Sequence, residues 1–399
     1  MMITANNGFI EQSERYAFNN AGESLKKYIL LKKGELAYNH GASKLRPYGS
    51  CFALTTAENA RIPFVYHCFS AENQNAEFMS IELNGAEIEN QLRKIVSSGA
   101  RMDGLLNISF DEYTSVSVLL PGIEEQDCIA DFFRQLDNLI TLHQREFAFL
   151  CKEKSKKFRY IKNAWEQRKF GEVFDCTVPN NTLSRAELSY DEGTVLNVHY
   201  GDVLIKYGSV LDVQKDDIPR IPHRCREDFN GALLQDGDVI IADTAEDETT
   251  GKACEIGNLQ GSAIVSGLHT MVCRPRNRMA LGYLGYYLNA NAYHYQLLPL
   301  MQGIKVLSLS RSNIQKTSVS YPSAMKEQQL IASYFSQLDH LITLHQRKYD
   351  KLTNVKKSML EKMFPQNGSN APEIRFKGFT EAWEQRKLGD VVDVRSGKD

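Results

Sequence analysis

The most regular pattern of hydrophobic and polar positions in this sequence occurs twice. The segment QLDNLITLHQR, Gln135 to Arg145, returns as QLDHLITLHQR from Gln337 to Arg347, 202 residues further on. Around each copy, apolar side chains and one histidine recur at steps of three or four residues. This spacing places them on one stripe of a helix, the seam that a coiled coil or helix hairpin buries. The two stripes are Ile129, Phe133, Leu136, Ile140, His143, Phe147 and Leu150, and Ile331, Phe335, Leu338, Ile342, His345, Tyr349 and Leu352. We expect the two matched helices to pair with each other.

Outside these helices, short apolar runs bounded by glycine and proline predict strands. In the first region we expect strands at 27–31, 35–38, 51–55 and 63–66, a helix at 86–97, and a strand at the end of 106–121. In the second region we expect strands at 195–199, 203–207, 238–242 and 262–265, and a helical run at 281–298. Two mixed globular regions therefore accompany the two helices.

Further repeats relate these two regions. The stretch 307–322 lines up without gaps against 106–121, and Gly34 to Asn39 resembles Gly237 to Asp243. The first region is therefore interpreted as a diverged copy of the latter part of the second.

A third repeat concerns the ends of the chain. AWEQRKFGEV at 164–173 opens the second region and returns as AWEQRKLGDV at 382–391, after the linker FPQNGSNAPE. The chain thus begins late in one copy of a domain and ends early in another. Joined end to end, the two fragments fall about 23 residues short of a complete domain.

The composition of the chain restricts the class of protein to which it can belong. A chain of 399 residues suits two or three domains, and 42% hydrophobic with 24% charged residues is typical of a soluble globular protein. The net charge of −2 gives no basic footprint over the whole chain, so any nucleic-acid binding must rest on local patches. Eight scattered cysteines without a C-x-x-C pair predict neither a zinc site nor a disulfide framework, and fit a reducing cytoplasm. There is no signal-peptide pattern and no apolar run long enough to cross a membrane.

The usual catalytic signatures are missing. The sequence contains no phosphate-binding G-x-x-x-x-G-K-[ST], no G-x-G-x-x-G after a strand, no N-P-P-[YF] and no H-E-x-x-H. No Asp or Glu is followed two residues later by Lys, as many metal-dependent nucleases require. His143 and His345 lie on apolar stripes, which favours hydrogen-bonded seam histidines over metal ligands. We therefore expect no catalytic site and no metal in this chain.

Candidate DNA contacts are local groups of basic and aromatic residues beside turns. Glycines that let the backbone approach a phosphate precede a basic residue in Gly99-Ala100-Arg101 and Gly303-Ile304-Lys305. A basic segment with aromatic residues, 145–169, fits either a solvated helix face with a linker or a phosphate contact. The candidates are Lys44, Arg46, Tyr48 and Arg101 in the first region, and Lys206 and Tyr207 at an expected strand end, Arg220, His223, Arg224 and Lys305 in the second.

Three motifs together resemble the DNA-specificity subunit of type I restriction-modification systems. They are the A-W-E-Q-R-K-[LF]-G-[ED]-V opening, the P-x-x-x-E-Q start of each helix (one residue longer from Pro322 to Gln328), and the Q-L-D-x-L-I-T-L-H-Q-R helices. They cover nearly the whole chain. The resemblance implies an α+β fold of two mixed α/β target-recognition domains separated by two long antiparallel coiled-coil helices. It also implies that the domains read the two halves of a split target in double-stranded DNA.

In that family the helices space the two domains and dock modification subunits, and a restriction subunit completes the complex. The resemblance gives the spacer and docking role to Leu136, Ile140, His143, Leu338, Ile342 and His345. It implies a cytoplasmic protein without cofactors of its own, since S-adenosylmethionine, ATP and Mg belong to the partner subunits. The expected segments are an incomplete first domain (1–122), a spacer helix (123–162), a complete second domain (163–322), a second spacer helix (323–364), a linker (365–380) and the opening of a further domain (381–399).

The order of segments departs from the family's usual domain, helix, domain, helix. The first domain lacks its opening and an opening stands at the C-terminus, which resembles a circular permutation or a recombination product. The C-terminal opening could then lie beside the N-terminal fragment and partly complete it. Two alternatives stay open, a partner-dependent or silent specificity fragment and a protein-interaction scaffold that does not bind nucleic acid.

Overall fold

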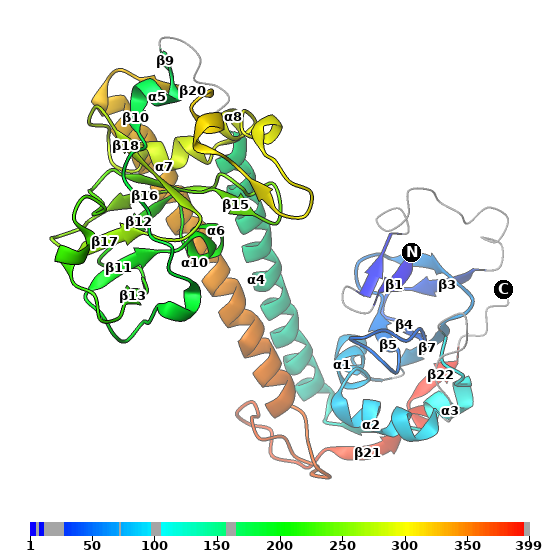
Figure 1. Cartoon of the computed structure of the whole chain (residues 1–399). Coiled ribbons are helices and arrows are strands. Elements are labelled where there is room, and N and C mark those ends of the chain that lie inside the picture. Colours follow the sequence, from blue (N-terminus) through cyan, green and yellow to red (C-terminus); the bar gives the residue numbers. More distant parts are fainter. Residues whose placement is uncertain (5–7, 12–27, 72, 97–104, 157–164, 395–399) are drawn as a thin grey trace. The chain divides into compact units, whose positions relative to one another are not determined.

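The chain divides into two compact units, each of which contains one half of each long helix. The computed structural model describes residues 1–4, 8–11, 28–71, 73–96, 105–156 and 165–394. Unit 1 comprises Met1–His143 and Lys348–Asp399, and unit 2 comprises Gln144–Arg347. The long helices are α4 (Ile123–Lys156) and α10 (Met325–Lys362), drawn in teal and orange in Figure 1. None of the described helices is both long and apolar enough to cross a membrane.

The seam residues of the two helices lie on their covered faces. In unit 2 the helices run antiparallel, because Glu146 pairs with His345 (Oε2 to Nδ1, 3.0 Å) and Lys154 pairs with Asp339. In unit 1, Asp137 of α4 pairs with Lys356 of α10. The buried seam residues are Ile129, Phe133, Leu136 and His143 in α4, and Ile331, Phe335 and Leu338 in α10. Ile140, Ile342 and His345 are half-buried.

Unit 2 is built around a five-stranded sheet whose order is β10-β18-β14-β16-β12. Its strands are β10 (Phe174–Asp175), β18 (Thr270–Pro275), β14 (Val239–Ala242), β16 (Ala253–Gly257) and β12 (Val210–Asp212). A three-stranded sheet contains β13 (Arg220–Ile221), β11 (Val195–Val198) and β17 (Ala263–Ser266), and β15 (Thr244–Ala245) pairs with β19 (Leu307–Ser308). The helices are α5 (Phe170–Val173), α6 (Tyr200–Ile205), α7 (Tyr283–Leu288), α8 (Asn291–His294) and α9 (Arg311–Ile314).

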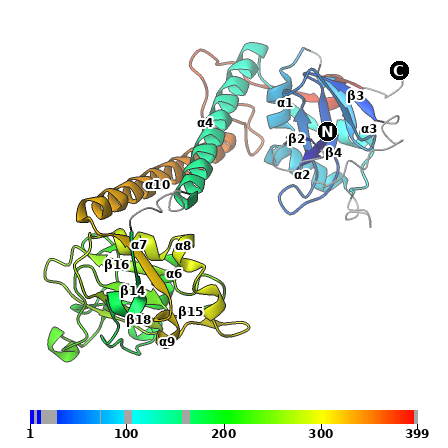
Figure 2. The same cartoon turned by 90° about the horizontal axis from the view of Figure 1, so that it is seen from above.

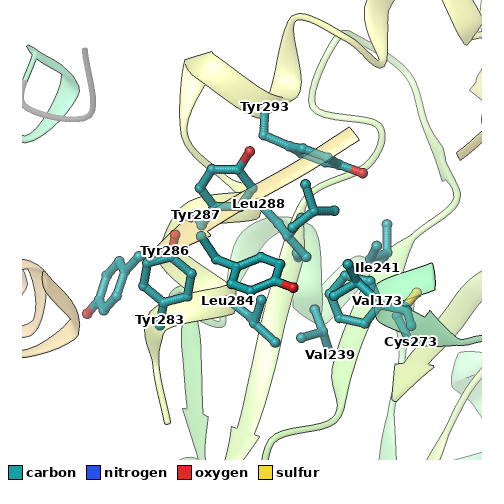
Figure 3. Packing of buried hydrophobic residues seen from close by; sticks show 14 of the residues in the cluster. Val173, Val239, Ile241, Cys273, Tyr283, Leu284, Tyr286, Tyr287, Leu288 and Tyr293 are labelled. Atoms are coloured by element: carbon teal, nitrogen blue, oxygen red, sulfur yellow. The ribbon is translucent and has the colours of Figure 1, made fainter. Parts of the chain in front are cut away.

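The core of unit 2 joins helix α7 to the central strands. Every residue of α7 is buried, and the tyrosines Tyr283, Tyr286 and Tyr287 pack with apolar residues of β14 and β18 (Figure 3). The same cluster includes Ile331, Phe335 and Leu338 of α10. The N-terminal half of α10 is therefore part of the hydrophobic core of unit 2, because its seam stripe is buried there.

The opening motif of unit 2 forms a strand against the end of the same unit. Strand β9 (Trp165–Lys169) pairs antiparallel with β20 (Ser318–Pro322), with Lys169 opposite Ser318 and Trp165 opposite Pro322. The next strand, β10, then pairs with β18, with Phe174 opposite Pro275. These two pairings close unit 2 around the start of α10.

The C-terminal segment performs the same closure in unit 1. Strand β21 (Glu384–Lys387) pairs with β8 (Ser117–Leu120), and Lys387 lies opposite Ser117 as Lys169 lies opposite Ser318. Strand β22 (Val392–Val394) pairs with β7 (His67–Ala71), with Val392 opposite Ala71 as Phe174 lies opposite Pro275. Both C-terminal strands thus occupy the register of their counterparts in the repeat. In Figure 1 they are the red strands among the blue and cyan elements of unit 1.

The sheet of unit 1 repeats four of the five strands of the large sheet of unit 2. Its order, β22-β7-β4-β5, corresponds to β10-β18-β14-β16, with β4 at Leu36–Asn39 and β5 at Ser50–Ala53. Within the described residues β5 is an edge strand, whereas in unit 2 the sheet continues to β12. The remaining strands pair as β1 (Met2–Thr4) with β2 (Gly8–Ile10) and β3 (Ile29–Lys32) with β6 (Asn59–Ile62). The helices are α1 (Ala76–Glu82), α2 (Ala86–Ile95) and α3 (Phe110–Thr114).

The same side-chain hydrogen bonds recur in the two units. Gln91 bonds both backbone groups of Ser117 at 2.8 Å, and Gln296 bonds those of Ser318 at 2.9 and 3.0 Å. Each amide satisfies one donor and one acceptor of a strand that continues into a long helix. Together with the matching strand registers, these bonds support the interpretation of the first region as a diverged copy of the second.

The glutamine of the P-x-x-x-E-Q motif joins each long helix to its unit. Gln126 donates to the carbonyl of Pro121 at 2.9 Å and accepts from the backbone of Asn75 at 3.0 Å. Gln328 donates to the carbonyl of Pro322 at 2.8 Å and accepts from the backbone of Ala280 at 2.9 Å. Both glutamines are buried, so each fixes the start of a helix against the globular part of its own unit.

Two expected strands are wrong. Residues 63–66 form a turn, closed by the bond from Tyr66 N to the carbonyl of Pro63, and the strands lie on either side as β6 and β7. Residues 203–207 overlap helix α6, whose start is capped by the His199 side chain, which accepts from Gly201 N. The other expected strands and helices overlap observed elements, although residue 27 and residues 97–104 and 157–164 lie outside the described residues.

Four short 3-10 helices complete the described elements. They are Arg185–Glu187, Arg226–Phe229, Leu298–Leu300 and Leu388–Asp390.

The C-terminal segment is held in unit 1 by a buried tryptophan. Trp383 is 2% exposed and packs edge-on against Phe78 and Phe364, and its backbone donates to the carbonyl of Asn370 at 2.8 Å. The described part of the expected further domain, 381–399, therefore belongs to unit 1.

Replacing this tryptophan should open unit 1 and leave unit 2 folded. We expect Trp383→Ala to destabilise unit 1 by about 3–5 kcal/mol, as for other large core aromatics. Hydrogen exchange should show β7 and β8 losing protection while β14 and β18 keep theirs. Glu384→Ala, an exposed neighbour, is the matched control and should change neither. Unaltered protection of β8 in the tryptophan variant would contradict this closure.

A buried glutamate should make the stability of unit 1 depend on pH. The Glu82 carboxylate accepts from Leu119 N at 3.1 Å, yet burial raises the pKa of Glu82 to about 7. Because the pKa of Glu82 is higher in the folded state than in the unfolded state, the carboxyl stabilises folded unit 1 fully at pH values below its unfolded pKa. This stabilisation is lost as the pH rises through about 7. For Glu82 the loss between about pH 4.5 and pH 7 is about 3 kcal/mol.

Glu82→Gln should remove this pH dependence in unit 1, as measured by hydrogen exchange at pH 5.5 and pH 8. Glu255, whose pKa burial likewise raises to about 7, provides the matched variant, because Glu255→Gln should act on unit 2 alone. Equal pH dependence of unit 1 in wild type and Glu82→Gln would refute the assignment.

Candidate nucleic-acid interface

Two of the expected DNA contacts of unit 2, Lys206 and Arg220, gather around Tyr190, together with Arg185. The Lys206 ammonium lies 4.6 Å from the centre of the Tyr190 ring and the Arg185 guanidinium lies 5.1 Å from it. Arg220 donates to the carbonyl of Tyr190 at 3.1 Å. Cations stacked on an exposed tyrosine form a surface that suits a phosphate backbone or a base edge.

Carboxylates compensate two of these cations. Lys206 donates to the Asp217 carboxylate at 2.8 Å, and Arg185 donates to the Asp202 carboxylate at 2.6 Å. Although burial opposes it, the hydrogen bonds from Lys206 to Asp217 and Tyr190 raise the pKa of Lys206. Phosphate contact by either residue would require these pairs to rearrange. The positive electrostatic potential of this cluster is therefore weaker than its number of basic residues indicates.

Tyr207 does not belong to this surface. It is buried in the core of unit 2, and burial raises the pKa of its phenol far above the ordinary range. Its hydroxyl donates to the carbonyl of Asp217 at 3.5 Å. The prediction that Lys206 and Tyr207 stand at a strand end is wrong, because Lys206 caps helix α6 and Tyr207 follows it into the core.

His223 and Arg224 lie in the turn after β13 and are exposed. His223 has a φ of 58°, a left-handed conformation that is uncommon outside glycine and often marks functional turns. Both side chains are accessible to a ligand, in contrast to Tyr207. They stay candidates for DNA contact.

The expected contacts of unit 1 have mainly structural partners. Arg46 donates to the carbonyl of Asn84 at 2.7 Å and so fixes its loop to the turn between α1 and α2. The carbonyl of Tyr48 accepts from the Tyr38 hydroxyl at 2.6 Å, and the Tyr48 side chain packs against the core. Lys44 is exposed and has the freedom to reach a phosphate. Arg101 lies outside the described residues.

Lys305 stands at the tip of an exposed hairpin that belongs to a different sheet from β13. The hairpin is closed by reciprocal backbone bonds between Gln302 and Ser308, of 2.9 and 2.8 Å. Its second arm, β19, pairs with β15. The structure therefore places Lys305 and the Arg220 group on separate elements of unit 2.

A charge pattern along the chain points to the part of unit 2 that includes this hairpin. Residues 256–326 contain seven Lys or Arg and no Asp or Glu, although the whole chain carries a net charge of −2. Arg274 is engaged in a two-bond pair with the buried carboxylate of Asp238. The remaining six are exposed, namely Arg276, Arg278, Lys305, Arg311, Lys316 and Lys326. A count of charge in windows would have found this stretch from the sequence.

An open cavity of about 830 Å³ in unit 2 lies between the globular part and the long helices. It is lined by Lys154, Lys252, Tyr286, Asp247 and His294, among others. Burial lowers the pKa of Lys252, whose ammonium donates to the carbonyl of Leu204 at 2.9 Å. Lys154 pairs with Asp339, and Asp247 accepts from the backbone of Thr249. Lys154, Lys252 and Asp247 are thus engaged with partners inside the protein.

Comparison with known proteins relates unit 2 to a family of DNA specificity domains. The family model of the type I restriction modification DNA specificity domain matches residues 162–354, which includes nearly all of unit 2. A curated type I restriction enzyme specificity subunit of Methanocaldococcus jannaschii, MjaX, is 22% identical over 241 residues, 58% of this chain and 53% of the relative. The chain thus spans about half the length of this relative.

Two solved structures are also similar in part. The HsdS subunit from Thermoanaerobacter tengcongensis is 17% identical, with a TM-score of 0.39 over 84% of this chain and 81% of that chain. The type I restriction-modification S subunit from M. genitalium is 13% identical, with a TM-score of 0.47 over 86% and 85%. The match over residues 162–354, just under half of the chain, shows that unit 2 carries a type I restriction modification DNA specificity domain.

Proposed function

We propose that this chain is the non-catalytic DNA-recognition subunit of a type I restriction-modification complex and reads a bipartite target with its two units. The observation that carries the proposal is the correspondence between unit 2, which matches the specificity domain, and unit 1. The four strands shared by the two sheets, the C-terminal closure and the glutamine bonds correspond in register. Two related domains on one chain suit a target of two half-sites.

The closure of unit 1 by its own C-terminal strands favours a chain that works without a second copy. Its alternative, a partner-dependent or silent fragment, needs unit 1 to lack its opening. The pairing of β21 with β8 supplies that opening from within the chain. A folded monomer in size-exclusion mass measurement would support this proposal, whereas an obligatory dimer would favour complementation between copies.

Methyl transfer and cleavage then belong to partner subunits, which would bind S-adenosylmethionine, ATP and Mg. The chain itself would contribute sequence recognition and docking.

The exposed faces of the long helices offer a docking surface for the modification subunits. Each copy of the repeated motif presents two leucines away from its seam, Leu139 and Leu142 in α4 and Leu341 and Leu344 in α10. They are 45%, 48%, 42% and 45% exposed. Because each pair stands one helical turn apart within the same motif, the two helices present matching apolar surfaces. Matching surfaces suit two copies of one partner.

DNA methylation tests the recognition function directly. The chain should be co-expressed with modification and restriction subunits of a type I system, and genomic DNA should be sequenced for modified bases. We expect a methylated bipartite motif that disappears without this chain. Genomic DNA without any such motif would contradict the proposed function.

Salt dependence distinguishes a DNA reader from a protein-interaction scaffold, for which the near-neutral net charge is the main support. A reader that neutralises several phosphates must lose affinity steeply as salt rises, by about a thousandfold or more between 50 and 200 mM for six to ten contacts. We expect gel shifts on random duplex to show this slope. Absence of duplex binding at low salt would favour the scaffold.

Serine substitutions of the exposed leucines test the docking surface. Leu341→Ser with Leu344→Ser should weaken binding of one modification subunit about tenfold or more, because each lost apolar contact at an interface core costs on the order of 1 kcal/mol. Native mass spectrometry should then show loss of one of two bound modification subunits. Leu330→Ser, at an exposed leucine of the same helix, is the control and should keep both. Two bound subunits in the double variant would exclude this surface.

A further inference from the structure

We propose that the hairpin tip Gly303–Val306 enters the major groove of DNA and that Ile304 contacts the 5-methyl group of a thymine. This inference rests on the proposed DNA recognition and names a specificity-determining side chain within it. It concerns unit 2 alone.

The exposure of Ile304 has no structural explanation within the unit. Its side chain is 99% exposed, and Val306 beside it is 52% exposed. An isoleucine held entirely in water contributes nothing to folding, since apolar side chains stabilise a protein through burial. An apolar side chain at the tip of a projecting hairpin gains free energy only when a partner covers it.

The base of the hairpin is fixed on both sides. Its second arm is hydrogen-bonded to β15, and Leu309 at its foot is buried and donates its backbone N–H to the carbonyl of Asp243 at 2.8 Å. Its first arm is held by Asn313, which donates to the carbonyl of Leu300 at 3.1 Å. A tip on such a base loses little conformational freedom when it binds, which favours specific contact.

The turn itself requires glycine. Gly303 has a φ of 128°, and a Cβ atom at this position would lie 1.9 Å from the carbonyl oxygen of Val306. The chain therefore folds back tightly and places Ile304 and Lys305 at the outermost positions. The tip keeps this shape only with glycine at 303.

The charges carried by the hairpin and by α9 favour a phosphate backbone over an acidic protein surface. The hairpin belongs to the stretch 256–326, which has no carboxylate side chain and seven Lys or Arg. Lys305 is exposed beside Ile304, and Arg311 and Lys316 are exposed on and just after α9. In Figure 2, α9 lies on the side of unit 2 away from α10. Three exposed acids, Glu246, Asp247 and Glu248, follow β15 beside the second arm, so the favourable charge for a polyanion is confined to the hairpin tip and α9.

The side chains of the tip determine which group of the DNA it can contact. The major groove admits a two-stranded ribbon, and the thymine methyl is its one apolar landmark. Ile304 has no donor or acceptor and suits that methyl, while Lys305 suits a neighbouring phosphate. The tip should therefore prefer T·A at one position of a half-site.

Selection from a random duplex pool with the intact chain, followed by replacement of single thymines by deoxyuridine, tests this contact. We expect one position of the selected half-site at which loss of the methyl weakens wild-type binding about fourfold. Ile304→Ser should bind thymine and deoxyuridine equally there. Lys305→Ala should weaken binding to all sequences and reduce the salt slope by about one.

Ile205→Ser is the matched control, since Ile205 is 89% exposed in the same unit but lies at the end of α6, next to Lys206. This variant should keep the wild-type response to deoxyuridine. The inference is overturned if Ile304→Ser stays sensitive to the methyl, if no thymine position is sensitive in wild type, or if Ile205→Ser alone loses the sensitivity. If wild type selects no duplex at all, the proposed DNA recognition itself fails.

Discussion

Unit 1 depends on the pairing of two segments that lie far apart in the sequence. Ser117–Leu120 and Glu384–Lys387 form four residue pairs, and Trp383 fills the core beside them. Loop-closure entropy rises only slowly with loop length, so the long separation in sequence costs little more than a short one. A large aromatic side chain buried at the junction can offset that cost. The two long helices, unit 2 and the linker lie between these segments in the sequence.

The two units also show how one arrangement tolerates divergence. In unit 2, Trp165 donates its indole N–H to the Glu327 carboxylate at 3.0 Å. In unit 1 the corresponding Glu125 is held instead by Arg375, through two bonds of 2.7 Å, and the indole N–H of Trp383 has no partner among the described residues. This glutamate, buried in unit 1 and half-buried in unit 2, keeps a partner in both. The glutamines next to these glutamates keep identical roles, which explains why the E-Q pair recurs in both helices.

Repeats made much of this architecture predictable from the sequence. The helix stripes, the alignment of 106–121 with 307–322 and the tryptophan-led opening all reflect local patterns that each unit reproduces. The errors lie where tertiary context decides. The run at 203–207 contains β-branched and aromatic residues but is helical, because His199 caps a helix that buries Val203 while Ile205 faces water. Burial of Tyr207 and exposure of Ile304 likewise depend on the packing of distant segments, which spacing along the chain does not reveal.

If both units read DNA, the pairing of β9 with β20 in unit 2 and of β21 with β8 in unit 1 makes the chain a reader of two half-sites. Hydroxyl-radical footprinting of the intact chain on its selected target tests this claim most directly. We expect two protected tracts on one duplex, separated by an unprotected spacer of constant length, with the tract read by unit 1 lost in a chain truncated before Trp383. A single protected tract in the intact chain, or two tracts that both survive the truncation, would contradict it.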